Sequence, residues 1–349
     1  MKTCDVAIIG AGPCGLFQAF ELGLLGISSV LFDALPEPGG QCVRLYPDKP
    51  IYDIPACPQI SARGLVDNLL AQLAPFSPEF CLQQKISQLL PQPDGGIVLH
   101  TSQGESWLAK AVVIASGAGA FEPIRLLVPG VEHHEGGQLR YAVPEREHYR
   151  GKQLVVVGGG DSALDWALNL IPVAASVTLV HRSERLRAQP HSVQAMQQAC
   201  ERLEMQFLTG RIAGLVEQDG QLSGVKVQST DGVTRRLACD ALLVLFGLAP
   251  QIRELREWGL ALSQNLIQVD TERFATSIPG VYAVGDINTY PGKQKLILSG
   301  FHEAALVAFA IKAQLNPGQP VQLQYTTTSP VMHQRLGVKP EIDDLLEGD

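Results

Sequence analysis

Short apolar runs alternate along the chain with longer segments whose apolar residues recur at helical spacing. The first run is Asp5 to Ile9 (DVAII), and the second lies in SSVLFD at 28–33. Between them, residues 16–26 (LFQAFELGLLG) have helical spacing. Apolar runs of this length are typical of strands buried on both faces, as in parallel sheets. The pattern therefore predicts a strand–helix–strand unit with parallel strands.

The same alternation returns later in the chain. A strand is predicted at 153–157 (QLVVV), followed by a helix in LDWALNLI and a returning strand in SVTLVHR. GVYAVGDI at 280–287 predicts another strand, and LSGFHEAALVAFAIKA predicts an amphipathic helix. We therefore expect an α/β fold with two Rossmann-like dinucleotide-binding domains.

Two further runs, 112–123 and 240–251, are typical of crossings between a domain and a second domain inserted into it. A chain of 349 residues is long enough for two cores. The predicted organisation is a first domain made of residues 1–119 and 243–349, with residues 120–242 forming the inserted domain.

The first predicted strand runs into GAGPCG at 10–15, which also opens the first predicted helix. In such a turn Gly10 makes the tight bend, Gly12 lets a pyrophosphate approach the backbone, and Gly15 lets the helix pack closely on the strand. The helix N-terminus supplies N–H groups for phosphates. Asp33, at the end of the second strand, can accept hydrogen bonds from ribose hydroxyls. This site is predicted to bind FAD or NAD.

The second turn, GGGDSA at 158–163, has a different partner at the end of its second strand. His181 lies 23 residues after Gly158, the spacing that separates Asp33 from Gly10, and arginines follow it. A cationic cluster favours a 2′-phosphate that an acid would repel, and each charge-assisted hydrogen bond contributes about 1.5–3 kcal/mol. We therefore predict an NADP site formed by Gly158, Gly160, Asp161, Ser162, Arg182 and Arg187.

Composition narrows the function classes. The formal net charge is −8, which argues against a general nucleic-acid-binding protein. We expect no membrane segment, because no run of about 18 apolar residues occurs, and no signal peptide, because the N-terminus enters a strand at once. The seven cysteines are scattered without a CxxC motif, which is typical of reduced thiols in the cytoplasm. No metal site is predicted.

These residues resemble those of the thioredoxin-reductase-like flavoproteins, most closely the ferredoxin–NADP reductases of thioredoxin-reductase type. The resemblance covers essentially the whole chain and is carried by GAGPCGLFQAFELGLLG, PEPGGQCVRLYPDKPIYDIP, GGGDSALDWALNL, GDINTYPGKQKLILSGFHEA and QYTTTSP. It implies FAD in the first site and NADPH/NADP+ in the second. It also implies a homodimer, and single-electron exchange with ferredoxin or flavodoxin. The flavin carries the chemistry, so no catalytic side chain is expected.

The resemblance also implies roles for matching positions. Asp33 would bind the adenosine ribose, Tyr46 would stack on the flavin ring, and Asp286 would hold the ribityl chain; a helix N-cap is the alternative for Asp286. Thr327 would come from a C-terminal extension folded over the ring, whose second face Tyr325 or His333 would cover. The FAD residues expected are Gly10, Gly12, Cys14, Gly15, Asp33, Gln41, Tyr46, Ile86, Phe121, Asp286 and Thr327.

Two departures matter. Thioredoxin reductases carry a CxxC before the second glycine turn, whereas this chain has no cysteine between Cys81 and Cys200. Electrons are therefore expected to leave the flavin directly. Ser183 stands where relatives often have a further arginine, so the preference for NADP would rest on Arg182 and Arg187.

Two other functions stay open at this point. Cys14 lies in the first glycine turn, where a helix N-terminus lowers a thiol's pKa, so it could serve as the redox group of a low-molecular-weight disulfide reductase. A packing role for Cys14 is the competing interpretation. The third alternative is a non-catalytic, redox-sensing flavin-binding module.

Overall fold

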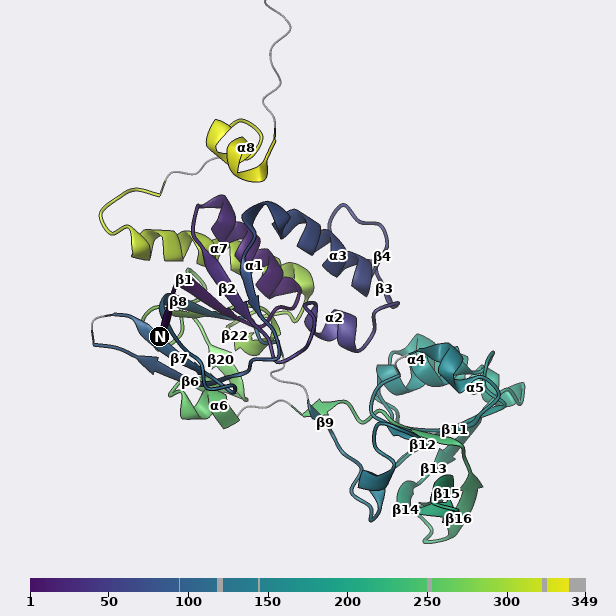
Figure 1. The fold of residues 1–349 in the computed structure, drawn as a ribbon. Helices are drawn as coiled ribbons and strands as arrows, with labels where there is room; N and C mark the ends of the chain where they lie inside the picture. Colours follow the sequence, from purple (N-terminus) through teal and green to yellow (C-terminus); the bar gives the residue numbers. More distant parts are fainter. Residues whose placement is uncertain (94, 118–121, 144, 250–252, 322–324, 339–349) are drawn as a thin grey trace, which may run out of the picture. The chain divides into compact units, whose positions relative to one another are not determined.

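The computed structural model describes residues 1–338 apart from 94, 118–121, 144, 250–252 and 322–324. The chain divides into two compact units: unit 1 is Met1–Ala120 with Pro250–Asp349, and unit 2 is Phe121–Ala249 (Figure 1). The second boundary thus lies after residue 249 rather than after 242. The reason is that β17 (Ala241–Val244) pairs along its whole length with β11 (Gln153–Val157) of unit 2.

Unit 1 is built on a mixed sheet whose central strand, β1, lies parallel to its neighbours on both sides. Ile9 at the end of β1 is in register with Phe32 of β2 and Ile114 of β8, and Ile114 is also in register with Ala283 of β21. The carboxyl ends of these strands therefore meet at one edge, where ligands bind in such sheets. The strand order is β5 (Glu79–Cys81), β2 (Ser29–Phe32), β1 (Lys2–Ile9), β8 (Ser106–Ile114), β7 (Ile97–Thr101) and β6 (Ile86–Pro91), with β21 (Val281–Ala283) on β8.

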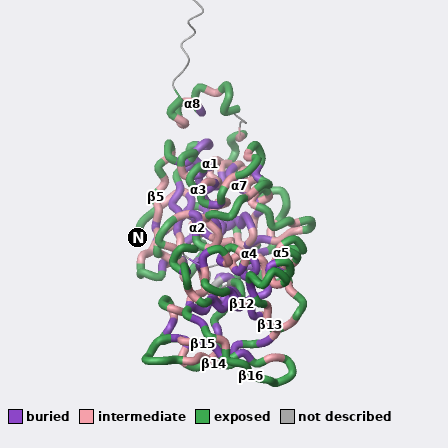
Figure 2. Tube along the Cα trace, turned by 90° about the vertical axis from the view of Figure 1, so that its right-hand side faces the viewer, coloured by how far each residue is buried: buried purple, intermediate pink, exposed green. Residues whose placement is uncertain are grey.

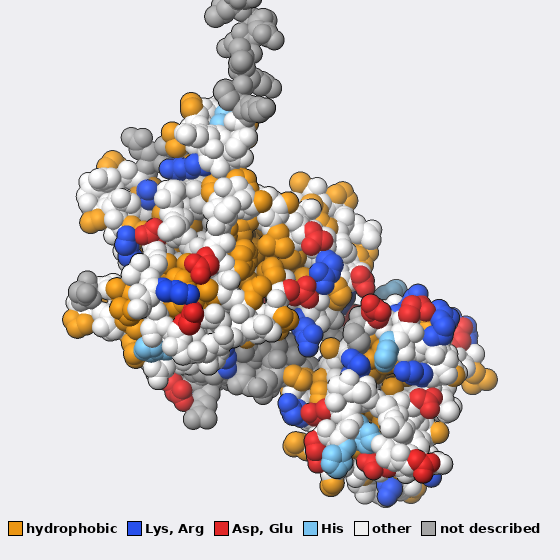
Figure 3. All heavy atoms as spheres, viewed as in Figure 1, with side chains coloured by type: hydrophobic (Ala, Val, Ile, Leu, Met, Phe, Trp, Pro, Cys, Tyr) orange, Lys and Arg blue, Asp and Glu red, His pale blue; other side chains and the backbone are white. Residues whose placement is uncertain are grey.

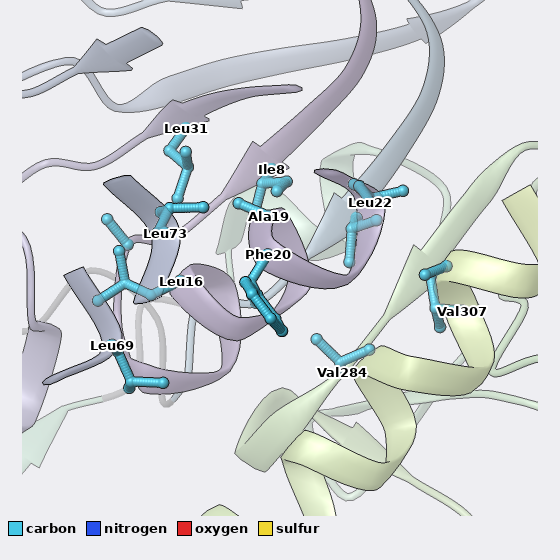
Figure 4. Close-up of a cluster of buried hydrophobic side chains, with 14 of the residues drawn as sticks. Ile8, Leu16, Ala19, Phe20, Leu22, Leu31, Leu69, Leu73, Val284 and Val307 are labelled. Carbon is cyan, nitrogen blue, oxygen red and sulfur yellow. The ribbon is translucent and has the colours of Figure 1, made fainter. Parts of the chain in front are cut away.

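Helices α1 (Pro13–Leu24), α3 (Ala62–Leu73) and α7 (Ile297–Leu315) pack with this sheet. Their apolar residues interlock with alternate residues of the strands, and Figure 4 shows side chains of α1 lying between those of the strands, α3 and α7. This arrangement fixes the N-terminal ends of α1 and α7 near the ligand-binding edge of the sheet. The labelled core residues are Ile8, Leu16, Ala19, Phe20, Leu22, Leu31, Leu69, Leu73, Val284 and Val307.

Shorter elements surround this core. Helix α8 packs against the C-terminal end of α1, where the Arg335 guanidinium donates to the Leu24 carbonyl and Met332 is buried. Lys312 of α7 likewise donates to the Leu25 carbonyl. The short elements are α2 (Gly40–Arg44), β3 (Pro50–Ile51), β4 (Ile60–Ser61), η1 (Ala74–Phe76), α6 (Arg253–Glu257), β19 (Leu262–Ser263), β20 (Leu266–Gln268), η4 (Gly285–Ile287), β22 (Asn288–Thr289) and α8 (Pro330–Leu336).

Unit 2 has its own parallel sheet, with α4 (Asp161–Leu170) and α5 (Pro190–Glu201) packed on it. Its strand order is β10 (Leu139–Arg140), β17, β11, β12 (Ser176–His181) and β13 (Gln206–Thr209). The antiparallel strands β14 (Arg211–Gln218), β15 (Gln221–Gln228) and β16 (Thr234–Ala238) form a second sheet. Figure 2 shows buried residues around β12, whereas β16 is largely exposed. Two 3-10 turns complete the unit, η2 (Val131–His133) and η3 (Arg146–Tyr149).

The two chain crossings pair with each other. Strand β9 (Glu122–Pro123) lies antiparallel to β18 (Leu248–Ala249), with Leu248 opposite Pro123. Both crossings therefore enter and leave unit 2 side by side (Figure 1). Among the described residues, no helix combines the length and the apolar character that a membrane span requires.

Candidate dinucleotide sites

The first glycine turn has two crowded glycines and one open one. Gly10 has φ +110°, and a Cβ there would lie 2.5 Å from the Ala115 carbonyl oxygen. A Cβ on Gly15 would lie 1.9 Å from the Gly10 carbonyl oxygen, so no side chain fits between helix and strand. A Cβ on Gly12, in contrast, would have Gly40 Cα at 3.9 Å as its nearest neighbour. The space beside Gly12 suits a group that must approach the backbone.

The N-terminus of α1 faces this space. Its N-cap is Gly12, which offers no side-chain cap, so the first N–H groups of the helix are available for a ligand. Helix α2 lies against the turn because the Gly39 N–H donates to the Ala11 carbonyl at 2.8 Å. Together these features fit the pyrophosphate of a dinucleotide such as FAD.

Asp33 follows β2 and points back to the turn. Its Oδ2 accepts from the Ala11 N–H at 2.7 Å, and its Oδ1 accepts from the Leu35 N–H at 2.8 Å. Burial raises the pKa of this carboxyl above its usual value, against the lowering effect of hydrogen bonds from the backbone of Leu35, Ala11 and Ala34. The structure therefore brings Asp33 to the glycine turn, where the ribose of a bound dinucleotide would lie.

Three other predicted FAD residues, Gln41, Tyr46 and Ile86, lie in unit 1. Gln41 is in α2, beside Gly40 and the space over Gly12. Tyr46 follows α2, half-buried, with its hydroxyl 3.9 Å from Cys42 Sγ, and burial raises the pKa of its hydroxyl. Ile86 begins β6 and its side chain is 2% exposed in the core, which leaves only its backbone for a ligand contact.

Asp286 lies in the 3-10 turn η4, directly after β21, and Cys14 packs beside this turn. A Cβ on Gly285 would lie 3.1 Å from Cys14 Sγ, and a Cβ on Gly300 of α7 would lie 2.2 Å from it. The sulfur therefore fills the space between α1, η4 and α7. Burial, with a further contribution from the Asp286 carboxylate, raises the pKa of the Cys14 thiol from 9.0 to about 12. Its environment is that of a packed, protonated thiol.

Behind η4 lies a fully buried carboxylate that the sequence analysis did not identify. Glu303 of α7 is 0% exposed and accepts from the Gly285 N–H at 2.7 Å, the Asn288 amide at 2.8 Å and the Tyr290 hydroxyl at 2.9 Å. The Lys293 ammonium, itself 6% exposed, forms an ion pair with it. Four donors thus converge on one carboxylate and fix the turn that presents Asp286. The available signal was a lone acid on the buried, helically spaced face of an apolar helix.

The flavin contacts predicted at the C-terminal end of the chain do not lie beside the first glycine turn. Thr327 is exposed in the turn before α8, and Tyr325 is 66% exposed. Helix α8, which carries His333, contacts the end of α1 opposite to Gly12. The structure therefore does not bring these residues to the glycine turn of the same chain. Phe121 lies outside the described residues.

The second glycine turn repeats the pattern of the first. A Cβ on Gly158 would lie 2.4 Å from the Leu245 carbonyl oxygen and 2.6 Å from the Ala163 Cβ, so the strand and α4 leave no room there. A Cβ on Gly160 would meet no atom of the described residues within 4 Å. Gly160 is also the N-cap of α4 and provides no side-chain cap. The arrangement leaves an open position and free helix N–H groups for a second pyrophosphate.

The basic segment after β12 lies against this turn. The Arg187 N–H donates to the Gly159 carbonyl at 2.7 Å, and the Gln189 N–H donates to Asp161 Oδ1 at 2.7 Å. Arg182 and Arg187 are both exposed. Burial of the His181 imidazole lowers its pKa, and the positive charges of the two arginines lower it further. The two predicted phosphate ligands thus gather at the end of β12, whereas Ser162 is exposed in the first turn of α4.

Comparisons with known proteins agree with this geometry. Residues 4–309 match the family described as pyridine nucleotide-disulphide oxidoreductase. The chain belongs to the pyridine nucleotide-disulphide oxidoreductase family. Within this family it is 53% identical over 340 residues to a protein of Cupriavidus taiwanensis named ferredoxin–NADP reductase 2, covering 97% of this chain and 92% of that protein. It is 50% identical to the ferredoxin–NADP reductase of Colwellia psychrerythraea, covering 99% of each chain.

Solved structures with the same fold include a thioredoxin reductase and a bacillithiol disulfide reductase. The thioredoxin reductase of Lactococcus lactis superposes with a TM-score of 0.74 at 24% identity, covering 89% of this chain and 99% of that one. The bacillithiol disulfide reductase of Staphylococcus aureus superposes with a TM-score of 0.75 at 17% identity, covering 90% and 99%. The predicted α/β fold and the resemblance to thioredoxin-reductase-like flavoproteins are confirmed. The protein is an oxidoreductase whose cofactors, by its family and its relatives, are FAD and NADP(H).

Proposed function

We propose that this protein is an FAD-dependent ferredoxin–NADP+ oxidoreductase, with ferredoxin or flavodoxin as its electron partner. FAD, when bound, supplies acceptance of a hydride from NADPH and release of electrons one at a time. The protein's part is to hold the two dinucleotides and to keep their reactive ends oriented. The names of its relatives, at 50–53% identity over nearly the whole chain, support ferredoxin as the partner.

The observation that carries this proposal is the contrast between the two strand ends. Asp33, whose Oδ2 accepts from the Ala11 N–H of the first turn, suits the free ribose hydroxyls of FAD, and an acid there repels a 2′-phosphate. Arg182 and Arg187 take the corresponding place beside the second turn and suit the 2′-phosphate of NADPH. Unit 1 is therefore the flavin unit, and unit 2 is the NADPH unit.

In unit 1, Gly12 and the N-terminus of α1 would hold the pyrophosphate, and Asp286 would hold the ribityl chain from η4. The carboxylate of Glu303 keeps η4 in place by accepting the Gly285 N–H. Tyr46 and Gln41 would contact the flavin from the segment after Gly39. We propose Phe121 and Thr327 as flavin contacts on the resemblance alone.

The alternative that uses Cys14 as a redox thiol is not favoured. Its sulfur fills the space that the missing side chains of Gly285 and Gly300 leave, and its pKa is raised to about 12. A thiol in this state is a poor nucleophile at neutral pH, because the thiolate is the reactive form. The seven cysteines are all free, and no two are spaced as CxxC.

We further propose a cytoplasmic homodimer. Free thiols without disulfides suit a reducing compartment.

An exposed apolar surface supports the proposed dimer. Figure 3 shows hydrophobic side chains gathered across the middle of unit 1. Phe17 of α1 and Phe301 of α7, with ring centroids 4.7 Å apart, are only partly buried, and Leu298 is 43% exposed. Light scattering should give a mass twice that of one chain, and Leu298→Glu should shift the measured mass toward that of the monomer. A monomeric wild-type protein at micromolar concentration contradicts the dimer.

A panel of electron acceptors tests the proposed function. The FAD-loaded protein is supplied with NADPH and given ferredoxin, flavodoxin, thioredoxin or a small disulfide at equal concentration. We expect ferredoxin or flavodoxin to be reduced at least tenfold faster than thioredoxin or the disulfide. Faster reduction of a disulfide, abolished by Cys14→Ala, would overturn the proposal in favour of the disulfide-reductase alternative.

A further inference from the structure

The basic segment between β12 and α5 has no regular secondary structure. Residues 182–189 include Arg182 and Arg187, whose side chains are exposed to solvent. An arginine pair binds a phosphate well only if the backbone beneath it is already in place, because ordering a mobile segment costs binding free energy. The contacts that hold this segment therefore decide how well it recognises a phosphate.

Two hydrogen bonds tie this segment to the second glycine turn. One is a backbone contact, from the Arg187 N–H to the Gly159 carbonyl at 2.7 Å. The other uses a side chain, since the Gln189 N–H donates to Asp161 Oδ1 at 2.7 Å. The two anchors are two residues apart, directly beside Arg187. Ser183 adds only a local contact, from its hydroxyl to the Arg185 carbonyl at 3.2 Å.

Asp161 stands where a carboxylate has two opposing effects on dinucleotide binding. It is the first residue of α4, next to the open position at Gly160 where a pyrophosphate is expected. A carboxylate there competes with the phosphates for the positive end of the helix dipole. Its charge alone therefore weakens dinucleotide binding, and its hydrogen bond to Gln189 is the compensating contact.

We propose that Asp161 is a positioning residue for coenzyme choice. Its hydrogen bond from the Gln189 N–H holds the arginine-bearing segment 182–189 against the glycine turn. The proposal rests on the proposed use of NADPH and assigns Asp161 a partner in the protein rather than in the cofactor. The carboxylate acts on the 2′-phosphate end through Arg187 and Arg182. It favours NADPH over NADH although its charge disfavours both.

Separate variants distinguish the hydrogen bond from the charge. Asp161→Asn keeps an oxygen acceptor for the Gln189 N–H and loses the charge. Asp161→Ala loses both, and Asp161→Ser keeps a polar residue suited to a helix start but is too short to reach Gln189. Glu201→Gln at the end of α5 is the matched control, because it removes one negative charge from an exposed residue of unit 2 outside the segment. The Ser variant decides the outcome if the Ala variant does not fold.

The first readout is steady-state kinetics of the FAD-loaded protein with NADPH and NADH. We expect the Ala and Ser variants to lower the ratio of kcat/KM for NADPH over NADH about tenfold, through KM rather than kcat, because the segment must then be ordered when the coenzyme binds. The Asn variant should keep this ratio within about twofold and lower KM for both coenzymes. The Glu201→Gln control should also keep the ratio.

The second readout needs no turnover. Calorimetric titration with adenosine 2′,5′-bisphosphate and with 5′-AMP measures the contribution of the 2′-phosphate directly. The Ala and Ser variants should lose about tenfold in affinity for the bisphosphate and little for 5′-AMP. An unchanged bisphosphate affinity in these variants, or an equal loss of affinity for both ligands, overturns the positioning role of Asp161. Failure of the wild type to oxidise NADPH would instead refute the proposed function.

Discussion

The buried ion pair behind η4 makes a quantitative prediction about unit 1. Glu303 is 0% exposed and Lys293 is 6% exposed, so Glu303→Gln leaves an ammonium group buried without its counter-charge. Breaking a buried pair in this way costs about 3–5 kcal/mol. The hydrogen bond from the Gly285 N–H to the carboxylate is also weakened, since bonds to charged groups are stronger than bonds to neutral ones. Because domains are stable by about 5–15 kcal/mol, this loss is a large fraction of the total.

Urea unfolding followed by the rise in flavin fluorescence on FAD release measures this effect in unit 1. With a urea dependence of about 3 kcal/mol per molar, the midpoint of Glu303→Gln should fall by about 1–2 M. The double variant Glu303→Gln/Lys293→Met removes both charges and should recover most of that loss, giving a coupling free energy of about 2 kcal/mol or more. Glu21→Gln on α1 is the control, because it removes a carboxylate outside this cluster. A loss below about 1 kcal/mol in Glu303→Gln, or additive effects of the two substitutions, refutes the reasoning.

Three further variants test the two dinucleotide sites. Gly12→Ala places a Cβ in open space, so we expect the FAD-free protein to unfold at the wild-type urea concentration while FAD affinity falls at least tenfold; unchanged affinity contradicts the pyrophosphate assignment. Cys14→Ala should keep NADPH-driven ferricyanide reduction within about twofold, and loss of turnover with FAD still bound would show that the thiol is needed. Because burial raises the pKa of the Cys14 thiol, this thiol should be alkylated at pH 8 more slowly than an unperturbed thiol, and its reaction rate should rise with pH between pH 7 and 9. Arg182→Ala should raise KM for NADPH about tenfold and leave KM for NADH unchanged; equal changes for both coenzymes contradict the 2′-phosphate contact.

The fold was predictable because it depends on local signals. Each glycine turn follows an apolar strand and opens a helix, and the structure gives each glycine the space that its place in the motif requires: Gly15 none, Gly12 an open position. Element ends were less predictable. The helix expected from residue 16 begins at Pro13, and β1 begins at Lys2 rather than at Asp5, because polar residues at the sheet margin continue the hydrogen-bonded ladder.

The candidate sites were predictable only as far as single positions carry a chemical signal. Asp33 and Arg182 could be assigned from the sequence, because their spacing from the glycine turns places them near the ribose and their charge indicates whether a 2′-phosphate is bound. The roles of Glu303 and Asp161 depend instead on partners that folding supplies, 18 residues away at Gly285 and 28 residues away at Gln189. Cys14 shows the same limit, since its neighbours Gly285 and Gly300 become visible only when α7 packs on α1.

The central claim is that electrons pass from NADPH through FAD to a one-electron protein acceptor. An anaerobic titration of the FAD-loaded protein tests it most directly, with flavin absorbance followed as NADPH and then oxidised ferredoxin are added. We predict that the flavin absorbance falls with NADPH, falls far less with NADH, and returns when ferredoxin or flavodoxin is added. Absorbance that never falls with NADPH, or that returns only with a disulfide, contradicts the account.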